Sequence, residues 1–381
     1  MDDWARLAEL PLRVDGYDLQ GLEPDFDAPF RRLTTVVRLH GGGGEGLGED
    51  VTYEREDHLR WWRHGAVIPL AGQHTLASFS ALLGRLELFP DPPTREESRP
   101  YRRWAFESAA LDLALRQAGG ALHQVLERRP RPVRFVFSTG LGRPPDTGRL
   151  RAWRALLPGL EFKLDAGNGW DEAFCAELGE LGGVQVVDLK GHYAGTSVQG
   201  EADAALYQRV AKAFPLAWLE DPAWTPATRE ALAPHLARVS WDAPVHDAVS
   251  LAALDPRPRI VNVKPSRSGT VQGLLELYAW CAREGIAAYG GGQFELGPGR
   301  GQIQYLAALF HPGAPNDVAP CAFHSATPRP GTSGSPLRPA PAPTGFRWIE
   351  TSPSPARPFR APGGSRTGRL VRRALARLRR R

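Results

Sequence analysis

The sequence predicts an α/β fold in which a small α+β domain precedes a (β/α) barrel. After Pro132, short apolar strands alternate with helical patterns, which is typical of parallel βαβ units. Before that point, strand-like patterns come first and helical patterns follow. The chain has 381 residues, 42% of them hydrophobic. This length suits two or three structural units, and the composition is sufficient for a large core.

Residues 1–130 form the predicted α+β domain. Residues 12–22 alternate between apolar and polar side chains, and residues 33–39 are rich in β-branched side chains. The glycine run 41–44 is expected to join the second strand to the next. Residues 56–126 have apolar side chains at helical spacing.

Residues 131–325 form the predicted barrel. An eighth strand near Val318 is a weaker candidate than the other seven. These units occupy about 190 residues, where about 250 is typical of a barrel, so we expect a compact one. A doubly wound sheet is the alternative fold. The seven clearer strands are 134–137, 160–165, 184–190, 216–220, 238–242, 259–264 and 286–289.

Residues 326–381 form a Pro-rich basic tail that we predict to be disordered, because its composition buries too little apolar surface. The exception is Gly345-Phe-Arg-Trp348, whose two aromatic side chains can dock against the body. From Gly331 onward there are twelve arginines and one acid, Glu350, so this part has a net charge of +11. The whole chain has a net charge of +5. The preceding 330 residues therefore sum to −6. A mildly acidic body is unlike a nucleic-acid-binding domain, so no nucleic-acid partner is expected.

Other classes of protein are excluded by composition. No apolar run reaches the length of about 18 residues that a membrane span needs. The N-terminus lacks the basic and apolar regions of a secretory signal. Three cysteines without metal-ligand spacing fit a reducing compartment, so we expect a cytoplasmic protein.

Acidic side chains follow three successive predicted strands of the barrel. Asp188, Glu220 and Asp242 each come directly after an apolar run. The carboxyl ends of barrel strands meet at one face, where catalytic groups stand. Oxygen ligands of this kind suit Mg²⁺, which usually takes few ligands from the protein. A single acid at a strand end is commonly a helix cap, but three in succession favour a magnesium site.

Lysine is rare in this chain, and its positions are therefore informative. Only four of 47 basic residues are lysines, and three of these, Lys163, Lys190 and Lys264, fall at strand ends. Side chains two apart on a strand share a face, so Lys163 pairs with Asp165, and Asp188 with Lys190. Such lysines can serve as general acids or bases, while the alternative is a structural salt bridge.

Several motifs resemble the enolase superfamily, especially its muconate cycloisomerase and o-succinylbenzoate synthase branch. The resemblance extends from about residue 10 to residue 320. The two most specific motifs are Trp218-Leu-Glu-Asp-Pro and Asn262-Val-Lys-Pro-Ser-Arg. The other matches are Gly44-Glu-Gly-Leu-Gly-Glu49, Phe106-Glu-Ser-Ala-Ala-Leu-Asp112-Leu-Ala and Glu295-Leu-Gly-Pro-Gly.

The resemblance implies a modified TIM-like (β/α)7β barrel with an N-terminal α+β capping domain. It also implies that Asp188, Glu220 and Asp242 bind Mg²⁺ and that Lys264 is an acid/base. Glu295, after the seventh strand, is a further catalytic candidate by the same resemblance.

Two motifs depart from the family pattern. The strand-two motif Lys-x-Lys is here Lys163-Leu-Asp165, and the strand-three motif Asp-x-Asn is here Asp188-Leu-Lys190. One ammonium has moved from strand two to strand three. This change argues against a standard two-lysine racemase and prevents the transfer of a named substrate.

The expected function is that of a magnesium-dependent lyase or isomerase that abstracts a proton α to a carboxylate. Dehydration or cycloisomerisation is favoured over racemisation. The substrate is expected to be a small carboxylic acid, and the chain can form a homo-oligomer. The alternative is a non-catalytic enolase-like protein that binds a metabolite or partner. The amides of Gly297-Pro-Gly-Arg300 can hold a substrate carboxylate or simply begin a helix.

Overall fold

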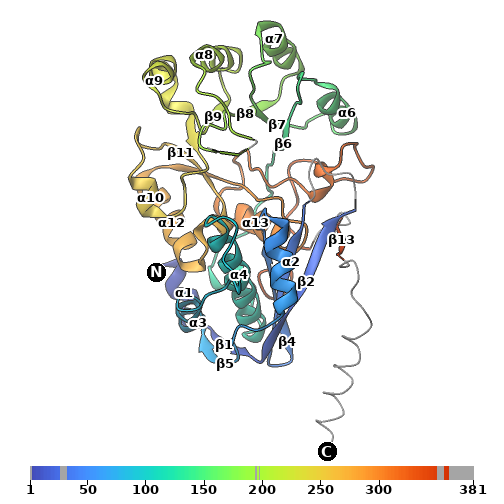
Figure 1. The fold of residues 1–381 in the computed structure, drawn as a ribbon, viewed down its shortest axis with the longest axis vertical. Coiled ribbons are helices and arrows are strands. Elements are labelled where there is room, and N and C mark those ends of the chain that lie inside the picture. Colours follow the sequence, from blue (N-terminus) through green and yellow to red (C-terminus); the bar gives the residue numbers. More distant parts are fainter. Residues whose placement is uncertain (1, 26–31, 194, 197, 350–355, 360–381) are drawn as a thin grey trace, which may run out of the picture.

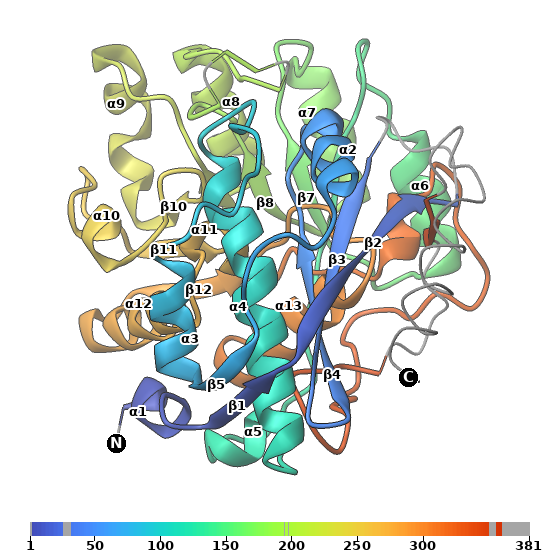
Figure 2. The ribbon, with the colours of Figure 1, turned by 60° about the horizontal axis from the view of Figure 1, so that its bottom comes forward.

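A computed structural model describes residues 2–25, 32–193, 195–196, 198–349 and 356–359. The chain forms a capping domain and a barrel that lie against each other, as Figures 1 and 2 show from two directions. Among the described helices, none is both long and apolar enough to cross a membrane.

The capping domain combines a four-stranded antiparallel sheet, a strand pair and packed helices. The sheet order is β13-β2-β3-β4, and β1 pairs separately with β5. The glycine run 41–44 joins β3 to β4, as predicted, whereas the predicted strand 12–22 is divided between two strands. The elements of the cap before the barrel are α1 (Asp3–Leu7), β1 (Pro11–Val14), β2 (Gly16–Pro24), β3 (Thr34–Gly41), β4 (Gly44–Asp50), α2 (Arg55–His64), β5 (Gly72–Thr75), α3 (Leu76–Leu83), α4 (Ser98–Gln117) and α5 (Leu122–Val125).

Helix α4 is the central element of the cap, and every residue from Trp104 to Leu115 is buried. It lies directly on β4 because that strand presents glycine to it. A Cβ on Gly48 would stand 1.9 Å from the backbone oxygen of Ala105, and one on Gly46 would stand 2.1 Å from that of Ala109. The glycines of this segment therefore permit a close helix–strand approach.

The barrel contains seven parallel strands in sequential order, from β6 to β12. Helices follow the strands and lie outside the sheet (Figure 1). The first strand begins three residues later than predicted, and the residues before it form single bridges, Val133 with Leu337 and Phe135 with Asn316. The elements are β6 (Phe137–Gly140), α6 (Gly148–Leu156), β7 (Phe162–Asp165), α7 (Glu172–Leu181), β8 (Val184–Asp188), α8 (Ala204–Ala213), β9 (Trp218–Glu220), α9 (Pro226–Leu232), η1 (Ala233–Arg238), β10 (Val239–Trp241), α10 (Ala248–Ala252), β11 (Ile260–Val263), α11 (Pro265–Ser268), α12 (Val271–Glu284), β12 (Ala287–Gly290), α13 (Pro298–Phe310) and η2 (Cys321–His324).

A short segment at Asn316 and Asp317 closes the barrel between its first and last strands. The amide of Asp317 donates to the oxygen of Gly290 at 2.7 Å, and the amide of Val136 donates to that of Asn316 at 2.9 Å. Both bridges are parallel. The fold is therefore the predicted (β/α)7β type, with its eighth strand reduced to this segment.

The C-terminal segment, residues 326–349 and 356–359, packs against the body of the protein, which corrects the prediction of a disordered tail over this part. Leu337 and Phe346 are buried, and Leu337 forms an antiparallel bridge with Val133. Strand β13 (Ala356–Pro358) adds to the edge of the cap sheet beside β2. Two buried apolar side chains and backbone pairing stabilise the segment in spite of its composition. Residues 350–355 and 360–381 lie outside the described residues.

Candidate active site

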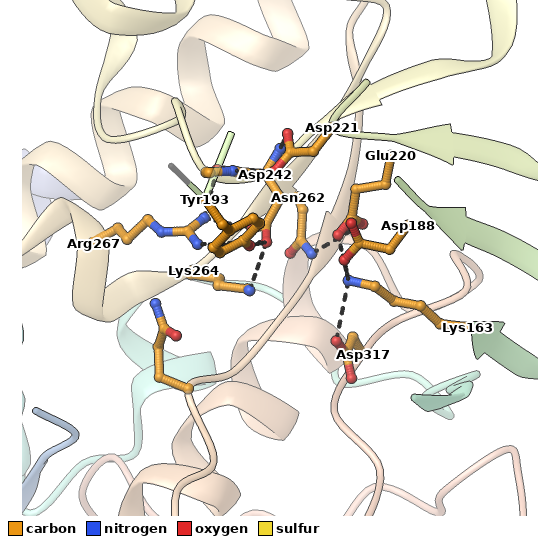
Figure 3. Close-up of polar contacts among 12 residues, drawn as sticks. Lys163, Asp188, Tyr193, Glu220, Asp221, Asp242, Asn262, Lys264, Arg267 and Asp317 are labelled. Carbon is orange, nitrogen blue, oxygen red and sulfur yellow. Dashed lines mark hydrogen bonds and ion pairs between the residues drawn. The ribbon is translucent and has the colours of Figure 1, made fainter. Parts of the chain in front are cut away.

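The predicted strand-end residues gather at the carboxyl end of the barrel. Asp165, Asp188 and Glu220 are the last residues of β7, β8 and β9, and Asp242 and Lys264 directly follow β10 and β11. Asp188, Glu220 and Asp242 are fully buried, and Lys264 is 7% exposed. Figure 3 shows Asp188, Glu220, Asp242 and Lys264 converging from several strands.

Lys163 lies at the centre of one group, the Lys163 cluster, formed with Asp188, Glu220 and Asp317. Its ammonium contacts Glu220 Oε1 and lies 3.5 Å from Asp188 Oδ2 and 3.3 Å from Asp317 Oδ2 (Figure 3). Burial alone would lower the pKa of Lys163, but the three carboxylates outweigh it and raise the pKa well above its ordinary value.

Lys190 contacts the acids at the ends of β7 and β8, the two strands whose motifs depart from the family pattern. Its ammonium lies 2.5 Å from Asp188 Oδ2 and 3.3 Å from Asp165 Oδ1. Lys190 therefore pairs with Asp188, two residues before it, and also contacts Asp165 on the neighbouring strand. Burial would lower the pKa of Lys190, but these two carboxylates raise it well above its ordinary value. Neither Lys163 nor Lys190 has the lowered pKa expected of a general base.

The backbone of Lys190 adopts a left-handed conformation, with φ of +54°. Such angles are uncommon outside glycine and often occur at functional sites. The same conformation occurs at Asp221, with φ of +48°. The carboxylate of Asp221 accepts hydrogen bonds from the amides of Asp242 and Ala243 at 2.7 and 2.8 Å, so it fixes the end of β10.

Asp242 is held by a second group of side chains. Lys264 Nζ lies 2.7 Å from Asp242 Oδ2, Arg267 Nη1 lies 2.5 Å from Oδ1, and the hydroxyl of Tyr193 donates to Oδ2 at 2.8 Å. Burial alone would raise the pKa of Asp242, but Arg267 and Lys264 hold it well below its usual range. Lys190 lies over the ring of Tyr193, 5.0 Å from its centroid, which connects the two groups.

The pKa values of Glu220 and Asp188 shift in opposite directions although both carboxylates contact Lys163. Burial raises the pKa of Glu220 well above its usual range, and the neighbouring carboxylates add to this effect despite Lys163. Burial would also raise the pKa of Asp188, but Lys190 and Lys163 together lower it to about 2. Glu220 also accepts hydrogen bonds from the hydroxyl of Tyr289 and, at 3.5 Å, from the amide of Asn262.

The donors at this site fit a divalent cation in chemical type and in charge. Asp188 and Glu220 already share one cationic group, and Asn262 Oδ1 is buried without a hydrogen-bond partner among the described residues. The site as a whole combines six carboxylic acids with four basic side chains, a formal excess of two negative charges. The acids are Asp165, Asp188, Glu220, Asp221, Asp242 and Asp317, and the basic residues are Lys163, Lys190, Lys264 and Arg267.

The carboxylates nonetheless point at basic side chains rather than around one open position. Within the described part of the chain, no three His, Cys, Asp or Glu side chains form a ready metal-binding group. Asp188 and Glu220 face Lys163, while Asp242 faces Lys264 and Arg267. A cation would therefore have to replace at least one of these ion pairs.

Glu295 lies apart from the other predicted residues. Its carboxylate accepts from the amide of Gln293 at 2.7 Å and forms an ion pair with Arg300 at 3.1 Å. The described contacts of Glu295 therefore join it to its own loop and to α13, and not to the lysines or the three acids.

The amides that begin α13 are occupied by a carboxylate of the cap. Glu49 accepts hydrogen bonds from the amides of Leu296, Gly297 and Gly299 at 2.7 to 3.1 Å. The motif therefore begins a helix, and its amides bind the carboxylate of Glu49. The interpretation that they hold a substrate carboxylate is wrong. The bond also joins the cap to the barrel, as do the hydrogen bonds of Arg32 to the oxygens of Gln293 and Phe294.

Sequence reasoning missed three residues of the site, namely Asp317, Arg267 and Tyr193. Asp317 lies within the weak eighth strand and not after it, so a search for acids that directly follow a strand does not find it. Arg267 stands three residues after Lys264, one helical turn away. Tyr193 belongs to the loop after β8, where no pattern marks it.

The chain matches two family models that together cover most of its length. Residues 5–125 match the N-terminal domain and residues 129–325 the C-terminal domain of a family described as "Domain of unknown function (DUF8230)". The chain is also 28% identical over 338 residues to the N-succinylamino acid racemase of Thermus thermophilus. That alignment covers 82% of this chain and 84% of the racemase.

Solved structures with the same fold are enzymes of the enolase superfamily. The dipeptide epimerase of Enterococcus faecalis V583 has a TM-score of 0.64 at 18% identity, over 88% of this chain and 99% of the epimerase. The muconate lactonizing enzyme of Pseudomonas putida has a TM-score of 0.62 at 18% identity, over 88% of this chain and 96% of that enzyme. The chain therefore belongs to the DUF8230 family and has the fold of the enolase superfamily.

Proposed function

We propose that the protein is a magnesium-dependent lyase or isomerase that removes a proton α to a carboxylate of a small organic acid. The observation that carries the proposal is the arrangement of Lys163 and Lys264, which reach the three acids from different strands of the barrel mouth (Figure 3). The names of similar proteins, a racemase, an epimerase and a lactonizing enzyme, support an isomerase or lyase.

Lys264 is the base in this proposal because its ammonium is the least neutralised by neighbours. Among the described residues, it forms an ion pair with one carboxylate, that of Asp242, whereas Lys190 pairs with two and Lys163 with three. Its position at the end of β11, 7% exposed, leaves it facing the mouth.

Lys163 and Lys190 supply positive charge on the other side of the site. Preorganised charges of this kind stabilise the negative charge that develops on the substrate without reorganising during the reaction. Lys190 is the more exposed of the two, with 17% of its side chain accessible, and is placed to return a proton to the product. Mg²⁺ bound by Asp188, Glu220 and Asp242 would neutralise the substrate carboxylate.

Exchange of the α-proton with deuterated water tests the proposal. The panel would contain N-succinylamino acids, dipeptides and muconolactone, the acids named in similar proteins. We expect Mg²⁺-dependent exchange with at least one acid, and its loss in Lys264→Ala. Lys212→Ala is the matched control, because Lys212 is exposed on α8. Binding of an acid and of Mg²⁺ without exchange would favour the alternative of a non-catalytic binding protein.

A further inference from the structure

We propose that the ammonium of Lys163 holds the place of the divalent cation and that Asp317 receives this ammonium when the cation binds. The Lys163–Asp317 pair would then be an internal competitor that sets the affinity for Mg²⁺. The inference rests on the metal site of the proposed function, and it assigns roles to two residues that do not need to touch substrate.

The contacts of Lys163 are those of a bound cation. Its Nζ contacts Glu220 and lies within 3.5 Å of the carboxylates of Asp188 and Asp317, so three acids from three different segments surround one charge. Asp188 and Glu220 are two of the three expected magnesium ligands. A metal ion cannot be bound by both carboxylates in this geometry while the ammonium remains between them.

Burial restricts where the ammonium can go. Lys163 is 1% exposed, and an ammonium without a partner in such surroundings is strongly destabilising. A displaced Lys163 therefore needs another carboxylate within reach. Among its described ion-pair partners, Asp317 is the one outside the expected set of magnesium ligands.

Asp317 is well placed for this role. It belongs to the closing segment of the barrel, where its amide is fixed to the oxygen of Gly290, so its position does not depend on the metal. Its side chain is 20% exposed, whereas those of Asp188 and Glu220 are fully buried. A carboxylate that is partly hydrated tolerates the loss and gain of a partner at lower cost than a fully buried one.

A static ion pair would give a different result from a competitor. In the static case, Lys163 and Asp317 affect the metal only through their charges, and the effects of the two residues on Mg²⁺ affinity add. In the competing case, Asp317 matters only because it accepts Lys163. The effect of Asp317 must then vanish when Lys163 is removed, which is a coupling that a double-mutant cycle measures.

The experiment is a calorimetric titration of the full chain with MgCl₂. The variants are Lys163→Met, Asp317→Asn and the double variant that combines them, with Lys190→Met, alone and together with Asp317→Asn, as the charge control. Lys190 contacts Asp188 and Asp165 but has no described ion pair with Glu220 or Asp317. Circular dichroism melting of each variant without metal checks that it is folded.

We expect Lys163→Met to bind Mg²⁺ about tenfold more tightly, because a competitor that fills the site in about nine of ten molecules lowers the apparent affinity by that factor. The substitution Asp317→Asn should lower the affinity for Mg²⁺ when it is made in the wild-type chain or in Lys190→Met. It should leave the affinity unchanged when it is made in Lys163→Met. Should Lys163→Met not fold, the same comparison with Lys163→Gln applies, and Asp317→Asn must still weaken binding.

The inference is overturned if Lys163→Met binds Mg²⁺ no more tightly than wild type, or if the effect of Asp317→Asn persists without Lys163. In either case Mg²⁺ binding by the wild-type chain leaves the proposed function standing. If no variant and no wild-type chain binds Mg²⁺, the inference and the magnesium-dependent function both fail.

Discussion

Replacement of Phe346 by Ala tests whether the C-terminal segment is part of the folded protein. The ring of Phe346 is fully buried and lies 6.0 Å from that of Tyr305, measured between centroids. Its backbone amide donates to Asp112 Oδ1 at 2.8 Å, a bond that alanine keeps. The cost is therefore the loss of apolar burial, about 2–3 kcal/mol, plus a cavity, giving about 3–5 kcal/mol in total.

Thermal and urea unfolding, followed by circular dichroism, measure this change. Ile349→Ala is the matched control, since Ile349 is 55% exposed and belongs to the same segment. We expect the control to stay within about 0.5 kcal/mol of wild type. If Phe346→Ala is as stable as Ile349→Ala, the segment does not contribute to the core and the reasoning is refuted.

Three further predictions follow from the contacts. Arg347→Ala removes a 2.8 Å ion pair to buried Asp112 and should lower the free energy of unfolding by about 1.5–3 kcal/mol in the same assay. Arg357 forms an exposed ion pair, so Arg357→Ala should leave the free energy of unfolding almost unchanged. Burial lowers the pKa of His58 to about 4, against about 6.5 when unfolded, so the unfolded state takes up the proton first as pH falls. The stability that neutral His58 provides is present above pH 6.5 and is lost between about pH 6.5 and 4, on the order of 2 kcal/mol at pH 5. His58→Gln should flatten the pH dependence of urea unfolding, and an unchanged slope would contradict the assignment. Lys190→Ala should slow α-proton exchange by about 10²-fold if Lys190 returns the proton, and unchanged turnover would remove that role.

The fold could be predicted because its signals are local. Strand–helix alternation after Pro132 and the glycines that contact α4 are visible in the sequence, and they correspond to the barrel and to the cap. The C-terminal segment could not be predicted from composition. Its order depends on two buried side chains, Leu337 and Phe346, whose partners are far away in the sequence.

The position of the candidate site could be predicted from strand ends, but its internal pairing could not. The exchange of an ammonium between strands two and three suggests that Lys190 meets Asp165, and the structure has this contact. Which carboxylate each lysine faces depends instead on side-chain directions in three dimensions. Asp317 and Tyr193 enter the site from segments without a strand pattern, so spacing does not reveal them.

The position of a bound metal tests the central claim most directly, namely that three strand-end acids share one cation. Crystals of the full chain grown with MnCl₂, in which Mn²⁺ stands in for Mg²⁺, would give an anomalous peak for the ion. We predict one peak within about 2.0–2.2 Å of oxygens of Asp188, Glu220 and Asp242, with Lys163 moved toward Asp317. A saturated crystal with no peak there, and with Lys163 still between Asp188 and Glu220, would contradict the account.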